Sequence, residues 1–171
     1  MNMEKNLSNE EAVKKFKKLV NDINVCMFIT NNNEQGHTRP MATIEVEENG
    51  NLWFFTDIRS VKVEEVNKDH IVHLVYAHPG KESFLDVWAN ASIVTDKQNI
   101  KDKWSPFVKA WFPEGPDDPN LALLRVQPQD VYYWDAEAGK MISFLKIIAG
   151  VVTGKPALSS DAQGILKVYN G

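Results

Sequence analysis

The sequence predicts a small α+β domain, built mainly from antiparallel strands that curl into a barrel. Three observations support this fold class. The chain has 171 residues, which is enough for one domain with a proper core and too few for two domains of ordinary size. About six or seven short β-rich runs alternate with turn signals, among them Asn49-Gly50, which is typical of a tight hairpin. A doubly wound parallel sheet would need a helix after nearly every strand, and the hairpins argue against that arrangement.

The composition is that of a soluble globular protein, with 43% hydrophobic and 25% charged residues. The net charge of -4 argues against a nucleic-acid partner, because such partners require a basic surface. The single cysteine, Cys26, cannot build a disulfide framework and fits a cytoplasmic location. The polar N-terminus is not typical of a secretory signal. The apolar stretch from Met141 to Val152 is shorter than the roughly 20 residues that span a bilayer, so we expect no membrane partner.

The first predicted element is a helix from about Asn9 to Asn21, which begins with the capping box Ser8-Asn9-Glu10-Glu11. The β-rich runs Val25–Thr30 and His37–Val46 then form a hairpin of two strands. Leu52–Thr56 follows the Asn49-Gly50 turn as a third strand, which we expect to be antiparallel to the second.

The middle of the chain predicts a short helix over Ser60–Lys68 and two further strands over Ile71–Ala77 and Phe84–Thr95. Asp96 is typical of a helix N-cap and predicts a helix to about Trp104. Ser105-Pro106 predicts the start of another helix that ends near Phe112.

Two more strands are predicted over Leu121–Val126 and Val131–Asp135, broken at Gln127-Pro128-Gln129. Met141–Val152 predicts a helix, and its paired β-branched residues leave a strand as the alternative. We expect one domain over residues 1–153 and a small, polar C-terminal tail over residues 154–171.

The stretch from Trp53 to Val66 suggests a site. It predicts a strand that ends at the hydroxyl of Thr56, a short polar turn, and a helix whose first residues carry Ser60 and Lys62. A helix N-terminus has unpaired N–H groups and a partial positive charge. Together with an ammonium group and hydroxyls, it forms a seat suited to a phosphate group.

Arg39 stands beside Pro40 in the second predicted strand. Proline removes a ladder donor, so this strand belongs at an edge or a bulge, and an exposed edge arginine is one interpretation. The alternative follows from the predicted hairpin between the second and third strands, which places Arg39 close to Thr56. Arg39 would then converge on the same phosphate as Ser60 and Lys62.

The order of these motifs resembles a known family. Arg39-Pro40-Met41, the strand Trp53–Thr56 and a Ser-x-Lys sequence at Ser60–Lys62 resemble the flavin-binding half of the pyridoxamine 5′-phosphate oxidase-like split-barrel proteins. Later motifs resemble the general stress protein branch of that superfamily; they are Trp104-Ser105-Pro106, Lys109–Pro113, Gly115–Pro119, Leu121–Val126 and Tyr133-Trp134-Asp135. The resemblance covers roughly residues 9–152.

The resemblance implies a six-stranded antiparallel split β-barrel with short peripheral helices, which forms a homodimer with FMN in clefts between the subunits. In such a protein, Arg39 and Lys62 would contact the FMN phosphate, while Ser60 and Thr56 would hydrogen-bond the phosphate or the ribityl chain. A dianionic phosphate is well held by a guanidinium group, an ammonium group and hydroxyls acting together.

The resemblance also implies residues that line the flavin ring. The backbone around Pro40, Met41 and Phe55 would lie along it. Trp111 and Trp134 of the partner subunit are candidates for the opposite wall, although packing in the core or the dimer interface is an alternative role for each.

The chain departs from the vitamin-forming oxidases of the superfamily. Val61 stands where a second basic residue is typical, and Trp88 stands where we expect a smaller residue. No arginine follows Trp134, whereas those oxidases grip the substrate phosphate with C-terminal arginine and histidine residues. Pyridoxamine phosphate oxidation is therefore not expected, while the ligands of the FMN phosphate are present.

The histidines do not predict a metal site. His70 and His73 are three residues apart on a predicted strand, so their side chains point to opposite faces and cannot share a zinc ion. No combination of nucleophile, base and orienting residue can be assembled from the sequence.

Three functions remain open. The first is an FMN-binding oxidoreductase-like protein, with NAD(P)H or another small molecule as a transient partner. The second is a flavin-binding stress or sensor protein without turnover. The third is a split-barrel protein that uses the same cleft for haem or a deazaflavin.

Overall fold

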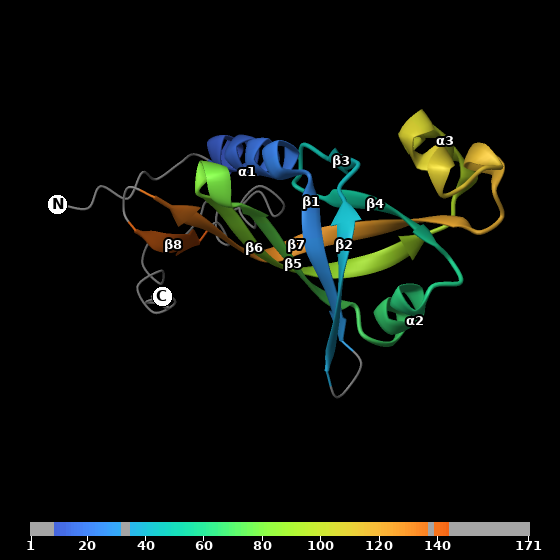
Figure 1. Cartoon of the computed structure of the whole chain (residues 1–171), viewed down its shortest axis with the longest axis horizontal. Coiled ribbons are helices and arrows are strands. Elements are labelled where there is room, and N and C mark those ends of the chain that lie inside the picture. Colours follow the sequence, from blue (N-terminus) through green and yellow to red (C-terminus); the bar gives the residue numbers. More distant parts are fainter. Residues whose placement is uncertain (1–8, 32–34, 137–138, 144–171) are drawn as a thin grey trace.

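The computed structural model describes residues 9–31, 35–136 and 139–143 (Figure 1). The expected tail over residues 154–171 lies outside the described residues, as does the end of the expected domain beyond residue 143. The strands are β1 (Val25–Asn31), β2 (Gly36–Ala42), β3 (Glu45–Val46), β4 (Leu52–Asp57), β5 (Ile71–His78), β6 (Ser83–Val94), β7 (Leu121–Asp135) and β8 (Lys140–Ser143). The helices are α1 (Asn9–Ile23), α2 (Val61–Lys68) and α3 (Lys97–Lys103), with short 3₁₀ turns η1 (Pro79–Lys81), η2 (Pro106–Ala110) and η3 (Gly115–Asp117).

The described strands form one antiparallel sheet, in the order β2-β1-β5-β6-β7-β4-β3, with β8 paired to β7. Six of these strands have six residues or more, whereas β3 has two and β8 has four. The predicted fold class, a mostly antiparallel split barrel with short helices, is therefore confirmed, with two short strands added to the expected six.

The split of the barrel follows from the strand order. The first strand of that order, β2, and the last, β3, are separated in the chain only by Thr43 and Ile44. The sheet must therefore curl until its two ends meet at this junction. Away from the junction β2 pairs only with β1, and β4 pairs with β3 and β7, so the sheet stays open between β2 and β4. Helix α2, which directly follows β4, lies at this opening.

The core fills the inside of the curled sheet. Alternate residues of each strand point inward, and the fully buried large side chains include Phe28, Phe54, Leu74 and Leu85. Helix α1 packs over β5 and β6 (Figure 1) and contributes the buried Phe16 to this core. The predicted amphipathic helix at the start of the chain is confirmed, because its apolar spacing matches the buried face.

A second apolar cluster lies on the other face of β4 and β7. Trp53 and Leu123 of the sheet pack there with Ile100 of α3 and Val108 of η2. Asp96 caps α3 by accepting a hydrogen bond of 2.9 Å from the backbone N–H of Asn99, as the sequence predicts. This cluster attaches α3 and η2 to the sheet at the same end of the molecule as α2 (Figure 1).

Two predictions for the C-terminal half are wrong. The stretch expected as two strands is one strand, β7, in which Pro128 is accommodated by a bulge: Trp88 pairs with Asp130 and Ala89 with Pro128, so Gln129 is left over. Met141–Ser143, expected to begin a helix, belongs to β8, and the rest of that predicted helix lies outside the described residues.

Candidate functional site

The predicted phosphate seat is built where β4 passes into α2. Thr56 is buried at the end of β4, and the turn closes with a hydrogen bond of 3.0 Å from the backbone N–H of Ser60 to the carbonyl of Asp57. Lys62 donates a hydrogen bond of 2.8 Å to the Thr56 hydroxyl, and the Ser60 hydroxyl lies 3.5 Å from the same oxygen. Ser60 is the N-cap of α2, yet its side chain makes no capping hydrogen bond. Its hydroxyl is therefore not needed to hold the helix.

Arg39 reaches this seat from the opposite edge of the split. Its half-buried guanidinium donates from Nη1 to the Thr30 hydroxyl over 2.8 Å and from Nη2 to Glu65 Oε2 over 3.2 Å. The predicted route through a hairpin with the third strand is wrong, because β4 pairs only with the two-residue β3 in that hairpin. Arg39 and Lys62 come together instead because α2 bridges the opening between β2 and β4. The prediction that Pro40 marks an edge strand is confirmed, since β2 ends the sheet.

The electrostatics of the seat favour an anion. Partial burial, the larger cause, and the positive charge of Arg39 together lower the pKa of Lys62 to about 8, with Asp57 acting weakly the other way. An anion that binds between Lys62 and Arg39 offsets the repulsion between their two positive charges. Hydroxyls, an ammonium group and a guanidinium group are also the donors that hold phosphate in proteins.

Glu65 is a site residue that sequence reasoning missed. Its side chain is buried on α2, accepts a hydrogen bond from the Thr30 hydroxyl, bonds to Nδ1 of His37 and pairs with Arg39. Burial raises the pKa of Glu65, but the hydrogen bonds from Thr30 and His37 and the nearby positive charges outweigh it, so the net shift is downward. The available signal was spacing, because residues three apart share a helix face and Glu65 follows Lys62 by three.

The residues expected along a flavin ring do not lie together within a single chain. Met41 is buried in the core, Pro40 is exposed, and Phe55 packs edge-on against Trp104 with ring centroids 6.0 Å apart. Trp111 is 67% exposed and packs against Phe107.

Trp134 is half-buried near the end of β7, opposite Met141 of β8. Thr56 of the phosphate seat lies opposite Ala122, at the other end of β7. In Figure 1 these two ends of the strand are on opposite sides of the molecule, so Trp134 does not reach the phosphate seat of its own chain.

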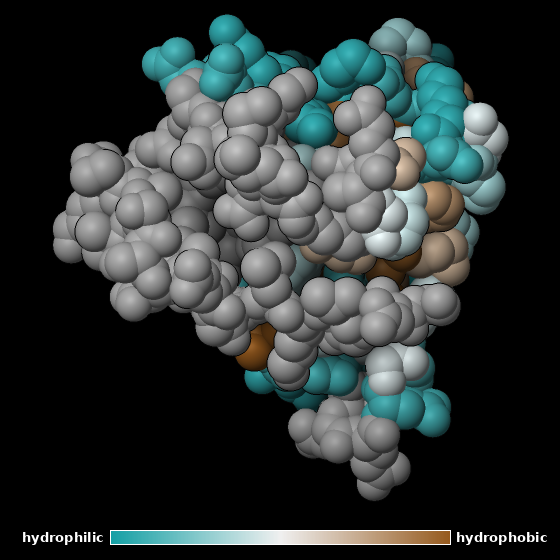
Figure 2. Space-filling view, turned by 90° about the vertical axis from the view of Figure 1, so that its left-hand side faces the viewer, coloured by the Kyte–Doolittle hydropathy of each residue, from teal (hydrophilic) through white to brown (hydrophobic). Residues whose placement is uncertain are grey.

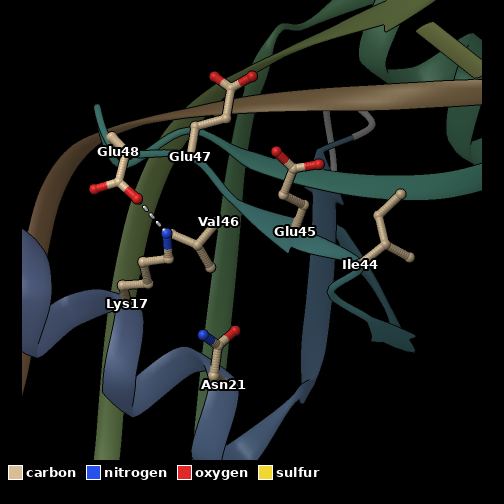
Figure 3. Close-up of a pocket in the computed structure, with 7 residues that line it drawn as sticks. All are labelled: Lys17, Asn21, Ile44, Glu45, Val46, Glu47 and Glu48. Atoms are coloured by element: carbon tan, nitrogen blue, oxygen red, sulfur yellow. Dashed lines mark hydrogen bonds and ion pairs between the residues drawn. The ribbon is translucent and has the colours of Figure 1, made fainter. Parts of the chain in front are cut away.

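A hollow of about 480 Å³ lies elsewhere, between α1 and β3 (Figure 3). Glu45, Glu47 and Glu48 border it, and Figure 3 shows Lys17 reaching Glu48 across it. The Lys17–Glu48 pair measures 2.6 Å, and Lys103 lies 2.7 Å from Glu45. The carboxylates that border this hollow would repel a phosphate and already have lysine partners. We therefore place the candidate site at Lys62 instead.

On β5, His73 interacts with side chains of β6. His73 bonds through Nε2 to Asp86 and stacks on the ring of Trp88, with centroids 4.1 Å apart. Within residues 9–31, 35–136 and 139–143, no three His, Cys, Asp or Glu side chains converge in a way that could hold a metal ion. In the same ranges, no helix is both long enough and apolar enough to cross a membrane.

The sequence of this chain is similar to those of known proteins. The sequence model of the family described as "Pyridoxamine 5'-phosphate oxidase like" matches residues 11–157. Protein bli-3 of Neurospora crassa is 27% identical over 150 residues, which cover 81% of this chain and 72% of that protein.

Solved structures match the fold. A general stress FMN/FAD binding protein from Xanthomonas citri has a TM-score of 0.63 and 28% identity, covering 72% of this chain and 87% of that one. A protein related to general stress protein 26 from Clostridium acetobutylicum has a TM-score of 0.69 and 21% identity, covering 80% of this chain and 95% of that one.

Proposed function

Because the chain belongs to the pyridoxamine 5′-phosphate oxidase-like family, we propose that it is an FMN-binding flavoprotein of the general stress type. The observation that carries the proposal is the pair of cations at the split of the sheet, Lys62 and Arg39, beside the hydroxyls of Thr56 and Ser60. This donor set matches a phosphate dianion, and FMN differs from riboflavin by that one group.

Each residue has a distinct part in this proposal. Lys62 and Arg39 neutralise the phosphate from the two sides of the split, and Ser60 and Thr56 donate hydrogen bonds to the phosphate or the ribityl chain. The backbone around Met41 and Phe55 lies along the ring system. The bound flavin would supply electron transfer, and the protein supplies binding and orientation.

The proposal includes a homodimer. The outer face of β1, β5 and β6 exposes Val25, Met27, Ile71 and Trp88, which are 41% to 50% exposed. Strand pairing makes this face continuous, because Ile29 lies opposite His73 and His73 opposite Trp88. An apolar face of this kind favours a protein contact. On the side of the molecule at the left of Figure 1, Figure 2 shows a few hydrophobic residues exposed among hydrophilic ones.

A second copy would also complete the site. Trp134 lies at the other end of β7 from the phosphate seat of its own chain, and Trp111 is exposed, so in this proposal both face the flavin held by the other subunit. NADH or NADPH would act as a transient electron donor over the flavin. We also propose a cytoplasmic location, which the single buried free cysteine, Cys26, favours.

The test is a titration of the purified protein with FMN and with riboflavin, followed by flavin fluorescence. We expect FMN to bind more tightly, and we expect Arg39→Ala and Lys62→Ala each to weaken FMN binding by about 1.5 to 3 kcal/mol, because each removes a charge-assisted hydrogen bond. Lys68→Ala is the matched control, since Lys68 is exposed on the same helix and pairs with Glu64. Equal affinity of the wild type for both flavins would contradict the proposal.

Reduction of the bound flavin separates an enzyme from a binding protein. If NADH or NADPH bleaches the flavin absorption and an acceptor restores it, the protein is an oxidoreductase. If FMN binds and neither nicotinamide cofactor reduces it, the sensor function is the better account.

A further inference from the structure

Glu65 links three elements beside the phosphate seat. From α2 its carboxylate bonds to Thr30 of β1 and to His37 and Arg39 of β2, and its side chain is only 6% exposed. A buried carboxylate is costly unless its oxygens are paired, and here both oxygens have partners. The carboxylate is therefore a fixed point against which other side chains can be held.

Arg39 is the side chain that this fixed point holds. Nη1 donates to Thr30 and Nη2 to Glu65, and the Thr30 hydroxyl in turn donates to the same carboxylate oxygen. Contacts to both terminal nitrogens fix the plane of the guanidinium. Because a guanidinium has five N–H donors, the remaining ones stay available for an anion. On an edge strand such as β2, an arginine without these contacts would extend into solvent.

The carboxylate could act in two opposite ways. As a negative charge near the seat, it competes with an anionic ligand for Arg39, and its removal would then strengthen binding. As an anchor, it keeps the guanidinium in place before the ligand arrives, and its removal would weaken binding. The contact of Glu65 with Thr30, which itself holds Arg39, favours the anchor, because all three groups lock one another.

We propose that Glu65 is a positioning residue, which holds Arg39 in the orientation that receives the phosphate of the cofactor. This inference rests on the proposed function, because it concerns the same phosphate seat.

The experiment measures the dissociation constants of FMN and riboflavin for the wild type and for Glu65→Gln. The ratio of the two constants isolates the phosphate, because a general loss of structure weakens both flavins alike. We expect Glu65→Gln to reduce the preference for FMN by about tenfold. Glu64→Gln is the matched control, since Glu64 is the exposed neighbour on the same helix. Thr30→Val, which removes the linking hydroxyl with little change of shape, should act in the same direction if Glu65→Gln fails to fold.

A double-mutant cycle tests whether Glu65 acts through Arg39. In an Arg39→Ala background, Glu65→Gln should change the FMN preference no further, because the group that it positions is absent. A second readout is the pH at which FMN binding weakens. Once Arg39 is released it no longer depresses the pKa of Lys62, so this pH should move upward in Glu65→Gln.

The outcomes separate the two proposals. If the wild type shows no preference for FMN over riboflavin, the proposed function fails. If the wild type prefers FMN and Glu65→Gln keeps or increases that preference, the proposed function stands and the positioning role is overturned. Additive effects of Glu65→Gln and Arg39→Ala would overturn it as well.

Discussion

Lys62 combines partial burial with the nearby charge of Arg39, so its proton is held weakly, with a pKa of about 8. Only the charged ammonium can neutralise a phosphate, and a bound phosphate favours that charged form. Below pH 8 the group is already charged when FMN arrives, whereas above pH 8 binding must be coupled to proton uptake. We therefore expect FMN affinity to be flat below about pH 8 and to fall by up to about tenfold per pH unit above it. Fluorescence titrations from pH 6.5 to about 9.5 would measure this.

Lys62→Arg provides the control for this dependence. An arginine stays charged throughout that range, so the decline above pH 8 should disappear even if its geometry lowers the absolute affinity. A decline of equal size in Lys62→Arg would assign the titration to another group.

Single residues show where sequence reasoning succeeded and where it stopped. Ser60, Lys62 and Thr56 could be placed together because they follow one another through a single strand-to-helix turn, whose geometry is local. Glu65 could not, because a glutamate on a short amphipathic helix is usually solvated, and only the long-range packing of α2 against β1 and β6, with hydrogen bonds to β1 and β2, buries it.

At the scale of elements, the two helix N-caps differ in a testable way. Asp96 accepts a backbone hydrogen bond at the start of α3, whereas the Ser60 side chain makes none at the start of α2. Asp96→Ala should therefore destabilise the protein by about 1 kcal/mol, and Ser60→Ala by less than about 0.5 kcal/mol. FMN affinity should show the reverse order, falling in Ser60→Ala and staying unchanged in Asp96→Ala. Thermal or urea unfolding and fluorescence titration give the two measurements, and a Ser60→Ala variant as unstable as Asp96→Ala would mean that this hydroxyl serves the helix.

An element boundary could be predicted from the sequence where the residues whose contact sets it are close together in the chain. Asp96 and its helix could be predicted because the cap and its partner are three residues apart. Pro128 suggested a break, yet β7 continues through it because the partner strand β6 allows a bulge there, and no local pattern reveals a partner. The pattern that begins at Met141 predicted a helix, with a strand as the alternative, and pairing with β7 makes Met141–Ser143 a strand.

For the whole molecule, the proposed homodimer predicts that one added charge on the outer sheet face will separate the subunits. Met27→Glu would place an unpaired carboxylate on the β1 part of that face, where it would lose its water on association. We expect the dissociation constant of the dimer to rise at least about tenfold and FMN binding to weaken with it. Light scattering after gel filtration would measure the mass. Lys14→Glu, which adds the same side chain on the exposed surface of α1, should remain dimeric.

The fold class and the family are confirmed by the structure and the comparisons, because both rest on motifs and turn signals spread along most of the chain. The path of the barrel could not be predicted in the same way. The sequence suggested that the second and third strands pair along their length, whereas the chain kinks at Thr43 and Ile44 and sends β2 and β3 to opposite ends of the sheet. The kink is needed because the curled sheet closes at the junction of β2 and β3. How the sheet closes depends on the pairing of all its strands, which no local sequence pattern reveals.

One consequence of this arrangement concerns solubility. A strand at the end of a sheet offers a row of unpaired donors and acceptors to which another molecule can add its own strand, the first step of fibrous aggregation. Among the described strands, β2, β3 and β8 each pair on one side only, and β2 is the longest of the three. Pro40 sits in the middle of the outer edge of β2 without an N–H to offer. The residue next to Arg39 therefore makes this edge less able to accept a further strand.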